Sequence, residues 1–313
     1  MLVALIDKLE ISDGAIEAAK AKLEQNGHSL VVFNSRTTNE GELVSRAENA
    51  EAVIFANIPF RESVISRLPK LKMISVAFTG TDLVDVAYCH AHGITVCNAS
   101  GYSTVPVAEL ALGMAISALR DFVLSDAATR LSEGRDGRVG QDLRGKTVGI
   151  IGTGAIGCYT AQIFKAMGCE VLGFSRTERP DFPGVYAPLD EVLHGSDIVS
   201  IHLPLTPVTR GLIGAMELAT MKPDAILINT ARGPIVDQEA LAAALHAGHL
   251  AHAAIDVFDI EPPLAQDHPM LGAPRTSLTP HIAYATKQAF ERRVEIVVEN
   301  VVMFANNDPV NVV

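Results

Sequence analysis

The chain has 313 residues, of which 48% are hydrophobic and 19% charged, and its net charge is −11. This length suffices for two domains, and the composition favours buried cores and excludes a disordered chain. The acidic balance, without any run of Lys and Arg, excludes a surface built for nucleic acid.

Targeting and membrane signals are weak. The apolar N-terminal residues end at Asp7, too soon for the core of a signal peptide, and no cationic segment precedes them. The most apolar stretch, Leu110 to Leu124, is interrupted by Arg120 and Asp121, so we expect no membrane span. The four cysteines have neither CxxC spacing nor an accompanying His pair, so we expect free thiols. These features predict a cytoplasmic protein without a membrane partner.

Short apolar runs alternate with helical segments and form two series. The first predicts a helix at Ile11–Gln25 and strands at Val3–Ile6, Leu30–Phe33, Ala52–Phe55, Met73–Val76 and Ile94–Val96. The second predicts strands at Thr147–Ile151, Glu170–Phe174, Ile198–His202, Ala225–Asn229, His252–Val257 and Thr276–Thr279. Strands with little internal alternation, separated by helices, are typical of parallel sheets covered on both faces. The predicted fold class is therefore α/β, with two doubly wound parallel sheets.

A long helical stretch, from about Val105 to Arg130, separates the two series. Its first half is apolar around the whole circumference, so we expect it to be buried on every side. Two interpretations remain open: a second subunit covers this helix, or it is an ordinary core helix. The C-terminal stretch Lys287–Asn306 is also helical. If it crosses back onto the first series, residues 1–101 and 284–313 form one discontinuous domain and residues 102–283 form the other.

A glycine-rich turn with the sequence GTGAIG, Gly152–Gly157, lies between a predicted strand and a helical pattern. In this context Gly152 makes the tight turn, Gly154 lets the backbone approach a pyrophosphate, and Gly157 lets the helix sit against the strand. The helix N-terminus adds N–H groups and a positive dipole for the phosphates. A glycine-rich turn without a ligand is the alternative, but the placement between strand and helix predicts a dinucleotide site.

The next strand ends without the acidic residue that binds the ribose hydroxyls in many such sites. Ser175, Arg176 and Thr177 stand there instead, with Arg179 close behind. Two hydroxyls and a guanidinium suit the dianionic 2′-phosphate of NADP. We therefore predict NADP as the cofactor. If Arg176 points to solvent or stacks on the adenine, the alternative is dual specificity or NAD.

Three polar residues of catalytic type, Arg232, Glu261 and His281, each come at or just past the end of a predicted strand. Ligands of open α/β sheets bind beyond the carboxyl ends of the strands, so these three loops should converge. The guanidinium of Arg232 would hold the carboxylate of a 2-keto acid. His281 would give a proton to the keto oxygen, and Glu261 would favour the charged imidazole and fix its orientation.

Each of these residues also has a structural interpretation when taken singly. Arg232 could form a cap or salt bridge, Glu261 could be a surface charge, and His281 could be a buried, hydrogen-bonded imidazole. Their joint placement favours catalysis. His202 ends a strand near the cofactor and either lines its pocket or has a structural role. The three histidines at positions 246, 249 and 252 straddle a glycine and a strand start, so we expect no metal site.

Five segments resemble, in order and spacing, the D-isomer-specific 2-hydroxyacid dehydrogenase family: Gly152–Gly157, His202–Thr206, Asn229–Gly233, Phe258–Pro262 and Thr279–Ala283. In the first series, Ala77–Asp85 resembles the substrate loop of this family. The resemblance implies a Rossmann-type nucleotide-binding domain and a flavodoxin-like substrate domain, with the active site in the cleft. It also implies a homodimer.

The resemblance assigns roles to individual residues. Arg232, Glu261 and His281 are implied as catalytic, and the backbone N–H groups of Thr79 and Gly80 as ligands of the substrate carboxylate. Thr230 and Asp256 are implied to lie against the nicotinamide half of the cofactor. Further positions are expected at the substrate (Phe78) or at the cofactor (Ala155, Ile156, His202, Pro204, Thr209, Ala231 and Ala283).

Two positions depart from the family pattern. Phe78 stands where the substrate loop usually has Gly, and its ring should reshape the substrate pocket. Ala155 stands where a basic residue is frequent, which removes one phosphate contact.

Within the family, the sequence GYST at residues 101–104, leading into Val107–Glu109, looks most like the hydroxypyruvate/glyoxylate reductase and glycerate dehydrogenase branch. A phosphoglycerate dehydrogenase is less favoured because no regulatory domain follows residue 306. We expect a hydride transfer between NAD(P)H and C2 of a small 2-keto or D-2-hydroxy acid of the glyoxylate, hydroxypyruvate or pyruvate type. A dinucleotide-sensing regulatory protein on the same fold is the alternative.

Overall fold

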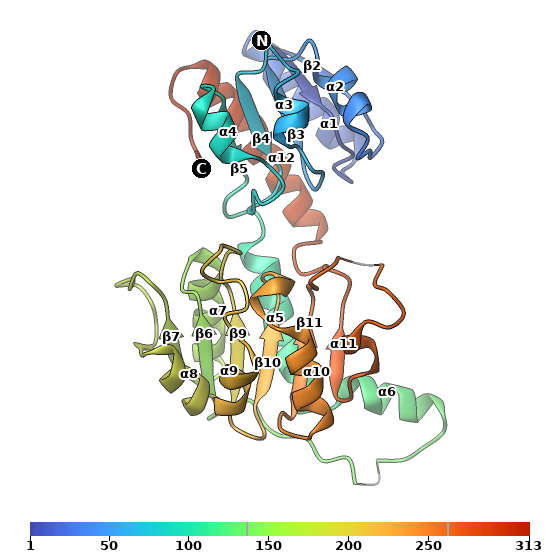
Figure 1. Cartoon of the computed structure of the whole chain (residues 1–313), viewed down its shortest axis with the longest axis vertical. Coiled ribbons are helices and arrows are strands. Elements are labelled where there is room, and N and C mark those ends of the chain that lie inside the picture. The colour runs from blue at the N-terminus through green and yellow to red at the C-terminus, as the bar shows by residue number, and fades with distance from the viewer. Residues whose placement is uncertain (136, 262) are drawn as a thin grey trace. The chain divides into compact units, whose positions relative to one another are not determined.

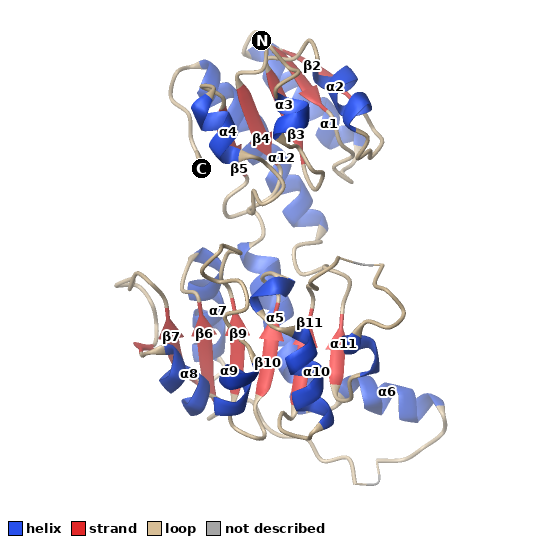
Figure 2. Cartoon of the chain, viewed as in Figure 1, coloured by secondary structure: helices blue, strands red, loops and turns tan. Residues whose placement is uncertain are grey.

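A computed structural model of the chain describes residues 1–135, 137–261 and 263–313. The chain forms two compact units, one of Met1–Ser103 with Ala285–Val313 and the other of Thr104–Tyr284. Each unit is a parallel sheet flanked by helices (Figures 1 and 2), which confirms the predicted α/β class. That the first unit binds the substrate stays a prediction.

The first unit has a five-stranded sheet in the order β2-β1-β3-β4-β5, which is the flavodoxin-like order. Its strands are β1 (Leu2–Leu5), β2 (Ser29–Val32), β3 (Ala52–Phe55), β4 (Met73–Val76) and β5 (Thr95–Asn98). Its helices are α1 (Asp13–Gln25), α2 (Glu40–Ala47), α3 (Glu62–Ile65), α4 (Val86–Ala91) and α12 (Lys287–Ala305). Helix α12 packs on α1, β4 and β5, so the C-terminal helix is part of this unit.

The second unit has a seven-stranded sheet in the order β12-β11-β10-β9-β6-β7-β8. Numbered from β6, this is the Rossmann order 3-2-1-4-5-6 extended by one strand. Its strands are β6 (Thr147–Ile151), β7 (Glu170–Phe174), β8 (Val185–Tyr186), β9 (Ile198–Ile201), β10 (Ile226–Asn229), β11 (His252–Ile255) and β12 (Thr276–Leu278). Its helices are α5 (Thr104–Leu119), α6 (Phe122–Arg130), α7 (Ala155–Ala166), α8 (Leu189–Gly195), α9 (Ala215–Thr220), α10 (Gln238–His246) and α11 (Pro269–Gly272), with a 3₁₀ turn, η1, at Gly233–Ile235.

Two apolar layers cover the two faces of this second sheet. Ala115 of α5 and Phe164 of α7 belong to one layer, whereas Leu193, Leu218 and Leu241 of helices α8, α9 and α10 belong to the other (Figure 1). The strand order reverses between β6 and β9. Open α/β sheets bind their ligands at this switch point, beyond the carboxyl ends of the strands.

The prediction of one continuous helical stretch before β6 is wrong. Helix α5 ends at Leu119 and α6 begins at Phe122, because Asp121 adopts a left-handed conformation with φ of 47°. Burial on every side is also wrong within a single chain, since Ile116 of α5 is 39% exposed. The two-residue strand β8 was absent from the predicted strands because it is too short to form an apolar run.

The four cysteines are free and buried, and burial raises the pKa of the Cys89 and Cys97 thiols to about 11. They are therefore protonated and unreactive at neutral pH. Among the described residues, no helix combines the length and the apolar character needed to cross a membrane.

Buried His252 on β11 should make the folding stability depend on pH. Its Nε2 lies 2.9 Å from Ser277 Oγ, while its Nδ1 is buried without a hydrogen-bond partner among the described residues. Burial lowers the pKa of His252 to about 4, whereas an unfolded chain has a value of about 6.5. Between these two pH values His252 is protonated in the unfolded chain and neutral in the folded chain. The free energy of unfolding therefore decreases as the pH falls below about 6.5.

The substitution His252→Gln keeps an amide within reach of Ser277 but removes the titration. We expect the loss in free energy of unfolding between pH 7 and pH 5 to shrink by about 2 kcal/mol in this variant, measured by urea unfolding at each pH. Exposed His246 supplies the control, since His246→Gln should leave the loss unchanged. An equal loss in wild type and His252→Gln would contradict the prediction.

Candidate active site

The glycine-rich turn between β6 and α7 has the close approaches that the three glycines predict. Gly152 has φ of +98°, and a Cβ there would lie 2.6 Å from the carbonyl oxygen of His202. A Cβ on Gly157 would lie 1.9 Å from the carbonyl oxygen of Gly152, so α7 packs directly on the turn. By contrast, a Cβ on Gly154 would meet nothing within 4 Å. Two of the glycines are therefore required by the turn itself, and the third faces open space.

Helix α7 begins at Ala155, followed by Ile156, and its N-cap is Gly154. Gly154 has no side chain to cap this end, and no side chain of the described residues does so. The first N–H groups of the helix are therefore available to an anion. Ala155 adds no charge here. The space over Gly154 and the uncapped helix end fit the pyrophosphate of a dinucleotide.

The loop after β7 holds the residues predicted to meet the adenosine ribose. Ser175 is partly buried, and Arg176 and Thr177 are exposed. Arg179, in contrast, makes two hydrogen bonds to the carboxylate of Asp181, at 3.0 and 2.9 Å. Arg176 has no ion pair among the described residues, so it is the free guanidinium of this loop.

His202 lies beside the glycine-rich turn at the end of β9. Its Nε2 is 2.9 Å from Ser200 Oγ, and burial lowers its pKa to about 4, so the ring is neutral at physiological pH. The following loop closes on itself, because Thr209 Oγ1 donates to the carbonyl of Pro204 at 2.7 Å. Both predicted functions of His202, in the pocket or in the fold, agree with this placement.

Thr230 and Ala231 follow β10 at the same edge of the sheet. The Ala231 N–H donates to Asn229 Oδ1 at 3.0 Å, which fixes the start of the loop. Thr230 Oγ1 is buried and has no hydrogen-bond partner among the described residues. A buried hydroxyl without a partner costs about 1–3 kcal/mol, so this atom fits a site that a polar ligand completes.

Asp256 lies fully buried after β11 and organises the segment that carries His281. Its carboxylate accepts the N–H groups of Ile282 and Ala283, each at 2.8 Å, and its carbonyl accepts the His281 N–H at 2.8 Å. Burial raises the pKa of Asp256, although these hydrogen bonds and one from Thr279 oppose the shift. His281 has φ of 55°, a conformation that few residues with a side chain adopt, and the bonds to Asp256 hold it there.

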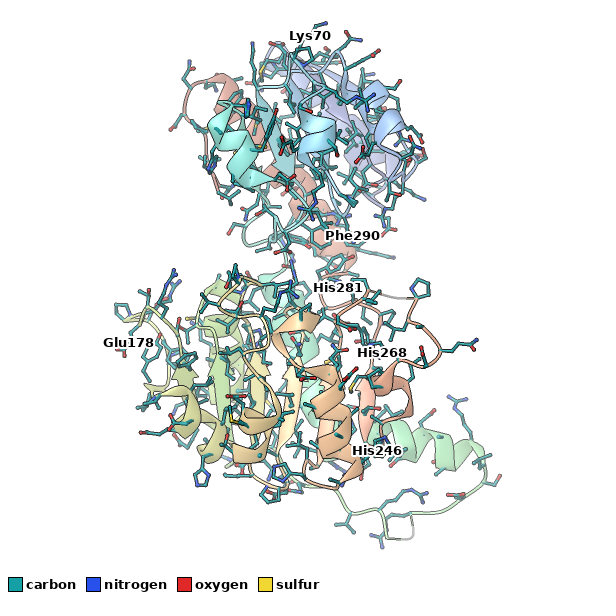
Figure 3. The ribbon with its side chains drawn as sticks, in the orientation of Figure 1. Lys70, Glu178, His246, His268, His281 and Phe290 are labelled. Atoms are coloured by element: carbon teal, nitrogen blue, oxygen red, sulfur yellow. The ribbon has the colours of Figure 1, made fainter. Side chains whose placement is uncertain are left out.

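His281 and Glu261 meet directly. His281 Nδ1 lies 3.1 Å from Glu261 Oε2, and the two side chains are 18% and 46% exposed. The edge of the imidazole contacts the ring of Tyr284, with centroids 5.2 Å apart. Figure 3 labels His281 at the edge of the second unit toward which the strand arrows of Figure 1 point. This leaves Nε2 of His281 as the atom that can face a substrate.

The Arg232 loop packs on the Glu261 loop. A Cβ on Gly233 would lie 1.9 Å from the carbonyl carbon of Phe258, so the two backbones are in contact. Arg232 itself precedes the turn η1, and its Nη1 donates to the carbonyl of Ala231 at 2.7 Å. The structure therefore brings Glu261 and His281 into contact and joins the loop of Arg232 to that of Glu261.

The predicted substrate loop lies in the first unit, after β4. Asn98 Nδ2 donates to the carbonyl of Thr79 at 2.8 Å, which braces the loop. The N–H groups of Thr79 and Gly80 make no hydrogen bond to another described residue, so they are available to a carboxylate. Phe78 is only 8% exposed, and its ring packs near that of Tyr102, with centroids 6.0 Å apart. That Phe78 reshapes the substrate pocket stays a prediction.

Comparison with known proteins agrees with this geometry. A family model described as "D-isomer specific 2-hydroxyacid dehydrogenase, NAD binding domain" matches residues 112–283. A glycerate dehydrogenase of Methylorubrum extorquens is 37% identical over 296 residues, which are 91% of this chain and 92% of that protein. A glyoxylate reductase of Aeropyrum pernix is 39% identical over 277 residues, which are 84% and 82% of the two chains.

A solved structure gives the same result. The D-lactate dehydrogenase of Aquifex aeolicus, complexed with NAD and lactic acid, superposes with a TM-score of 0.85 at 30% identity, over 98% of this chain and 96% of that chain. The chain belongs to the D-isomer-specific 2-hydroxyacid dehydrogenase family. It is thus an oxidoreductase that uses a nicotinamide dinucleotide to interconvert small 2-keto and 2-hydroxy acids.

Some contacts within this dehydrogenase site do not follow from the sequence, which assigns Asp256 only to the cofactor and Gly233 only to a family segment. Tyr284 contacts His281, Gly233 allows the approach of the Arg232 and Glu261 loops, and Asp256 holds the His281 segment. Gly233 stands directly after Arg232, so its position was a usable signal. The roles of Tyr284 and Asp256 depend on side-chain directions that no sequence pattern gives. Pro262, the last residue of one family segment, lies outside the described residues.

Proposed function

We propose that this dehydrogenase reduces a small 2-keto acid of the glyoxylate, hydroxypyruvate or pyruvate type, with His281 as proton donor. The observation that carries the proposal is the 3.1 Å contact between His281 Nδ1 and Glu261 Oε2, which orients the ring. Arg232 supplies the guanidinium for the substrate carboxylate, and the N–H groups of Thr79 and Gly80 supply further donors.

A bound nicotinamide supplies the hydride for this reaction. The protein holds the 2-keto acid by its carboxylate and presents His281 Nε2 to the keto oxygen. As C2 gains the hydride, the C=O double bond becomes a single bond, the oxygen takes the proton from Nε2, and His281 becomes neutral. Oxidation of the D-2-hydroxy acid is the reverse, with neutral His281 as the base.

A panel of 2-keto acids tests the proposal. We expect turnover with glyoxylate, hydroxypyruvate or pyruvate when the reduced cofactor is added, measured by the loss of absorbance of NADH and NADPH. Binding of the cofactor without turnover on any 2-keto acid would overturn the proposal and favour a dinucleotide-sensing regulatory protein. The curated relatives described above are named as enzymes, so the regulatory alternative is not favoured.

We infer further that NADPH is the preferred cofactor. The support is the exposed guanidinium of Arg176, which has no ion pair among the described residues and stands between Ser175 and Thr177. None of these three residues at the tip of β7 is the Asp or Glu that would repel a 2′-phosphate. A charge-assisted hydrogen bond contributes about 1.5–3 kcal/mol, which corresponds to roughly ten- to a hundredfold in selectivity.

Replacing this guanidinium should remove the preference. We expect Arg176→Ala to lower kcat/KM for NADPH by about ten- to a hundredfold and to change kcat/KM for NADH little. Arg179→Ala is the matched control, because the Arg179 guanidinium is held by Asp181 and should contribute less. Equal efficiencies of the two cofactors in the wild type, or a preference untouched by Arg176→Ala, would exclude this role.

A second copy of the chain is the partner that we propose for α6. The first turn of this helix exposes apolar residues, of which Phe122 is 68% exposed and Leu124 52%, and the residue that follows the helix, Leu131, is 73% exposed. Exposed apolar side chains that lie together are typical of interaction surfaces. We expect sedimentation equilibrium to give a dimer for the wild type and a monomer for Phe122→Asp with Leu124→Asp. A monomeric wild type would contradict this assignment.

A further inference from the structure

The loop that carries Glu261 is closed at its base by a second histidine–carboxylate pair. His268 Nε2 lies 2.9 Å from Asp259 Oδ1, and His268 Nδ1 accepts the N–H of Met270 at 3.3 Å. Because Nδ1 is the acceptor, Nε2 carries the proton and donates it to the carboxylate. The His268 side chain is only 6% exposed, whereas that of Asp259 is 53% exposed.

Asp259 is held as an anion at this position. Burial opposes its ionisation, but hydrogen bonds from the His268 ring and the Ile260 N–H outweigh it and lower the pKa of Asp259 below its usual value. The pair is therefore a charge-assisted hydrogen bond with a buried donor, the kind that fixes geometry well. The His268 ring is held in turn by Phe258, which it meets edge to face with centroids 5.7 Å apart.

This pair lies at the junction of the two catalytic loops. Glu261 follows Asp259 by two residues, and the Gly233 that follows Arg232 would place a Cβ 2.5 Å from the Asp259 nitrogen. A shift of the Asp259 backbone would therefore move Glu261 and also disturb the contact that positions the Arg232 loop. The Glu261 carboxylate bonds to the His281 side chain, which it is itself expected to orient. The position of Glu261 must therefore be set by the backbone of its own loop.

We propose that His268 is a positioning residue for catalysis, which sets the place of Glu261 through Asp259 and thereby the orientation of His281. The inference rests on the proposed function, because it needs Glu261 and His281 to act together. His268 does not touch the substrate. Its effect is to keep the carboxylate within bonding distance of the imidazole during turnover.

Removal of the ring tests the proposal. We expect His268→Leu to lower kcat by roughly ten- to a hundredfold, since a misplacement of about 1 Å at a catalytic group has effects of this size. The dissociation constant of NADPH, measured by its fluorescence, should stay within about twofold, because the cofactor segments are untouched. His268→Gln keeps an N–H donor near the Nε2 position and should restore most of kcat. A simple loss of packing would not be rescued in this way.

Two further variants guard against a folding defect. Asp259→Ala changes an exposed side chain, so it should fold normally and lower kcat as His268→Leu does. His249→Leu is the matched control. His249 Nε2 also makes one hydrogen bond, to the backbone carbonyl of Leu218 at 2.9 Å, but it lies away from the catalytic loops. Its kcat should equal that of the wild type. Unchanged kcat in Asp259→Ala would overturn the proposal whatever His268→Leu does.

A double-mutant cycle separates this inference from the proposed function. If His268 acts through Glu261, His268→Leu should cost far less kcat in a Glu261→Gln background than in the wild type. Equal costs in both backgrounds would overturn the positioning role. If Glu261→Gln alone keeps the kcat of the wild type, the proposed catalytic pair fails and the inference fails with it. If Glu261→Gln is impaired while His268→Leu is not, only the inference fails.

Discussion

The substitution His281→Gln is expected to lower kcat by about 10²–10⁴-fold, the usual contribution of a general acid. Glutamine fills a similar volume and offers an amide, but it cannot release a proton to the keto oxygen at neutral pH. The dissociation constant of the cofactor should change little, because Asp256 binds the backbone of Ile282 and Ala283 rather than the His281 side chain. Steady-state kinetics and a fluorescence titration with NADPH measure the two quantities.

The backbone conformation of His281 calls for a second variant. Because φ is 55° at this position, glutamine is less tolerated than histidine, whereas asparagine adopts this conformation readily. His281→Asn should therefore fold at least as well as His281→Gln and be equally inactive. His249→Gln, away from the catalytic loops, should keep the wild-type kcat. If either His281 variant turned over within about threefold of the wild type, His281 would not be the proton donor.

The strands were predictable because of where they lie. Parallel strands that are covered on both faces are apolar at nearly every position, so Ala52–Phe55 and Thr147–Ile151 stand out as runs, and both are strands with these bounds. Strand β8 is at the sheet edge and has two residues, Val185 and Tyr186, so it leaves no run to detect. The break between α5 and α6 depends on one left-handed residue, Asp121, whose conformation is set by context.

The catalytic site was predictable to the level of strand ends. Parallel topology brings the carboxyl ends of β10, β11 and β12 to one edge, and this suffices to expect Arg232, Glu261 and His281 near one another. The sequence does not show which residues hold these three side chains in position. The bonds from Asp256 to the His281 segment and from His268 to Asp259 join residues whose side-chain directions follow only from the folded loops.

Two alanine substitutions in the glycine-rich turn should separate folding from cofactor binding. At Gly157 a Cβ would lie 1.9 Å from the carbonyl oxygen and 3.0 Å from the carbonyl carbon of Gly152, both backbone atoms that cannot move without opening the turn. We expect Gly157→Ala to lower the free energy of unfolding by about 3 kcal/mol, the upper end of the cost of overpacking. Urea unfolding without cofactor measures this loss directly.

Gly154→Ala should behave in the opposite way, because its Cβ meets nothing within 4 Å in the protein alone. The free energy of unfolding without cofactor should therefore stay the same or rise by about 0.5 kcal/mol, since alanine restricts the unfolded chain. With cofactor the added methyl group would occupy the space that the pyrophosphate needs, so the dissociation constant of NADPH should rise by about tenfold or more. A fluorescence titration with NADPH tests where the pyrophosphate binds. Wild-type affinity in Gly154→Ala would mean that the pyrophosphate does not lie over this glycine. Weak binding by a variant of unchanged stability would place it there.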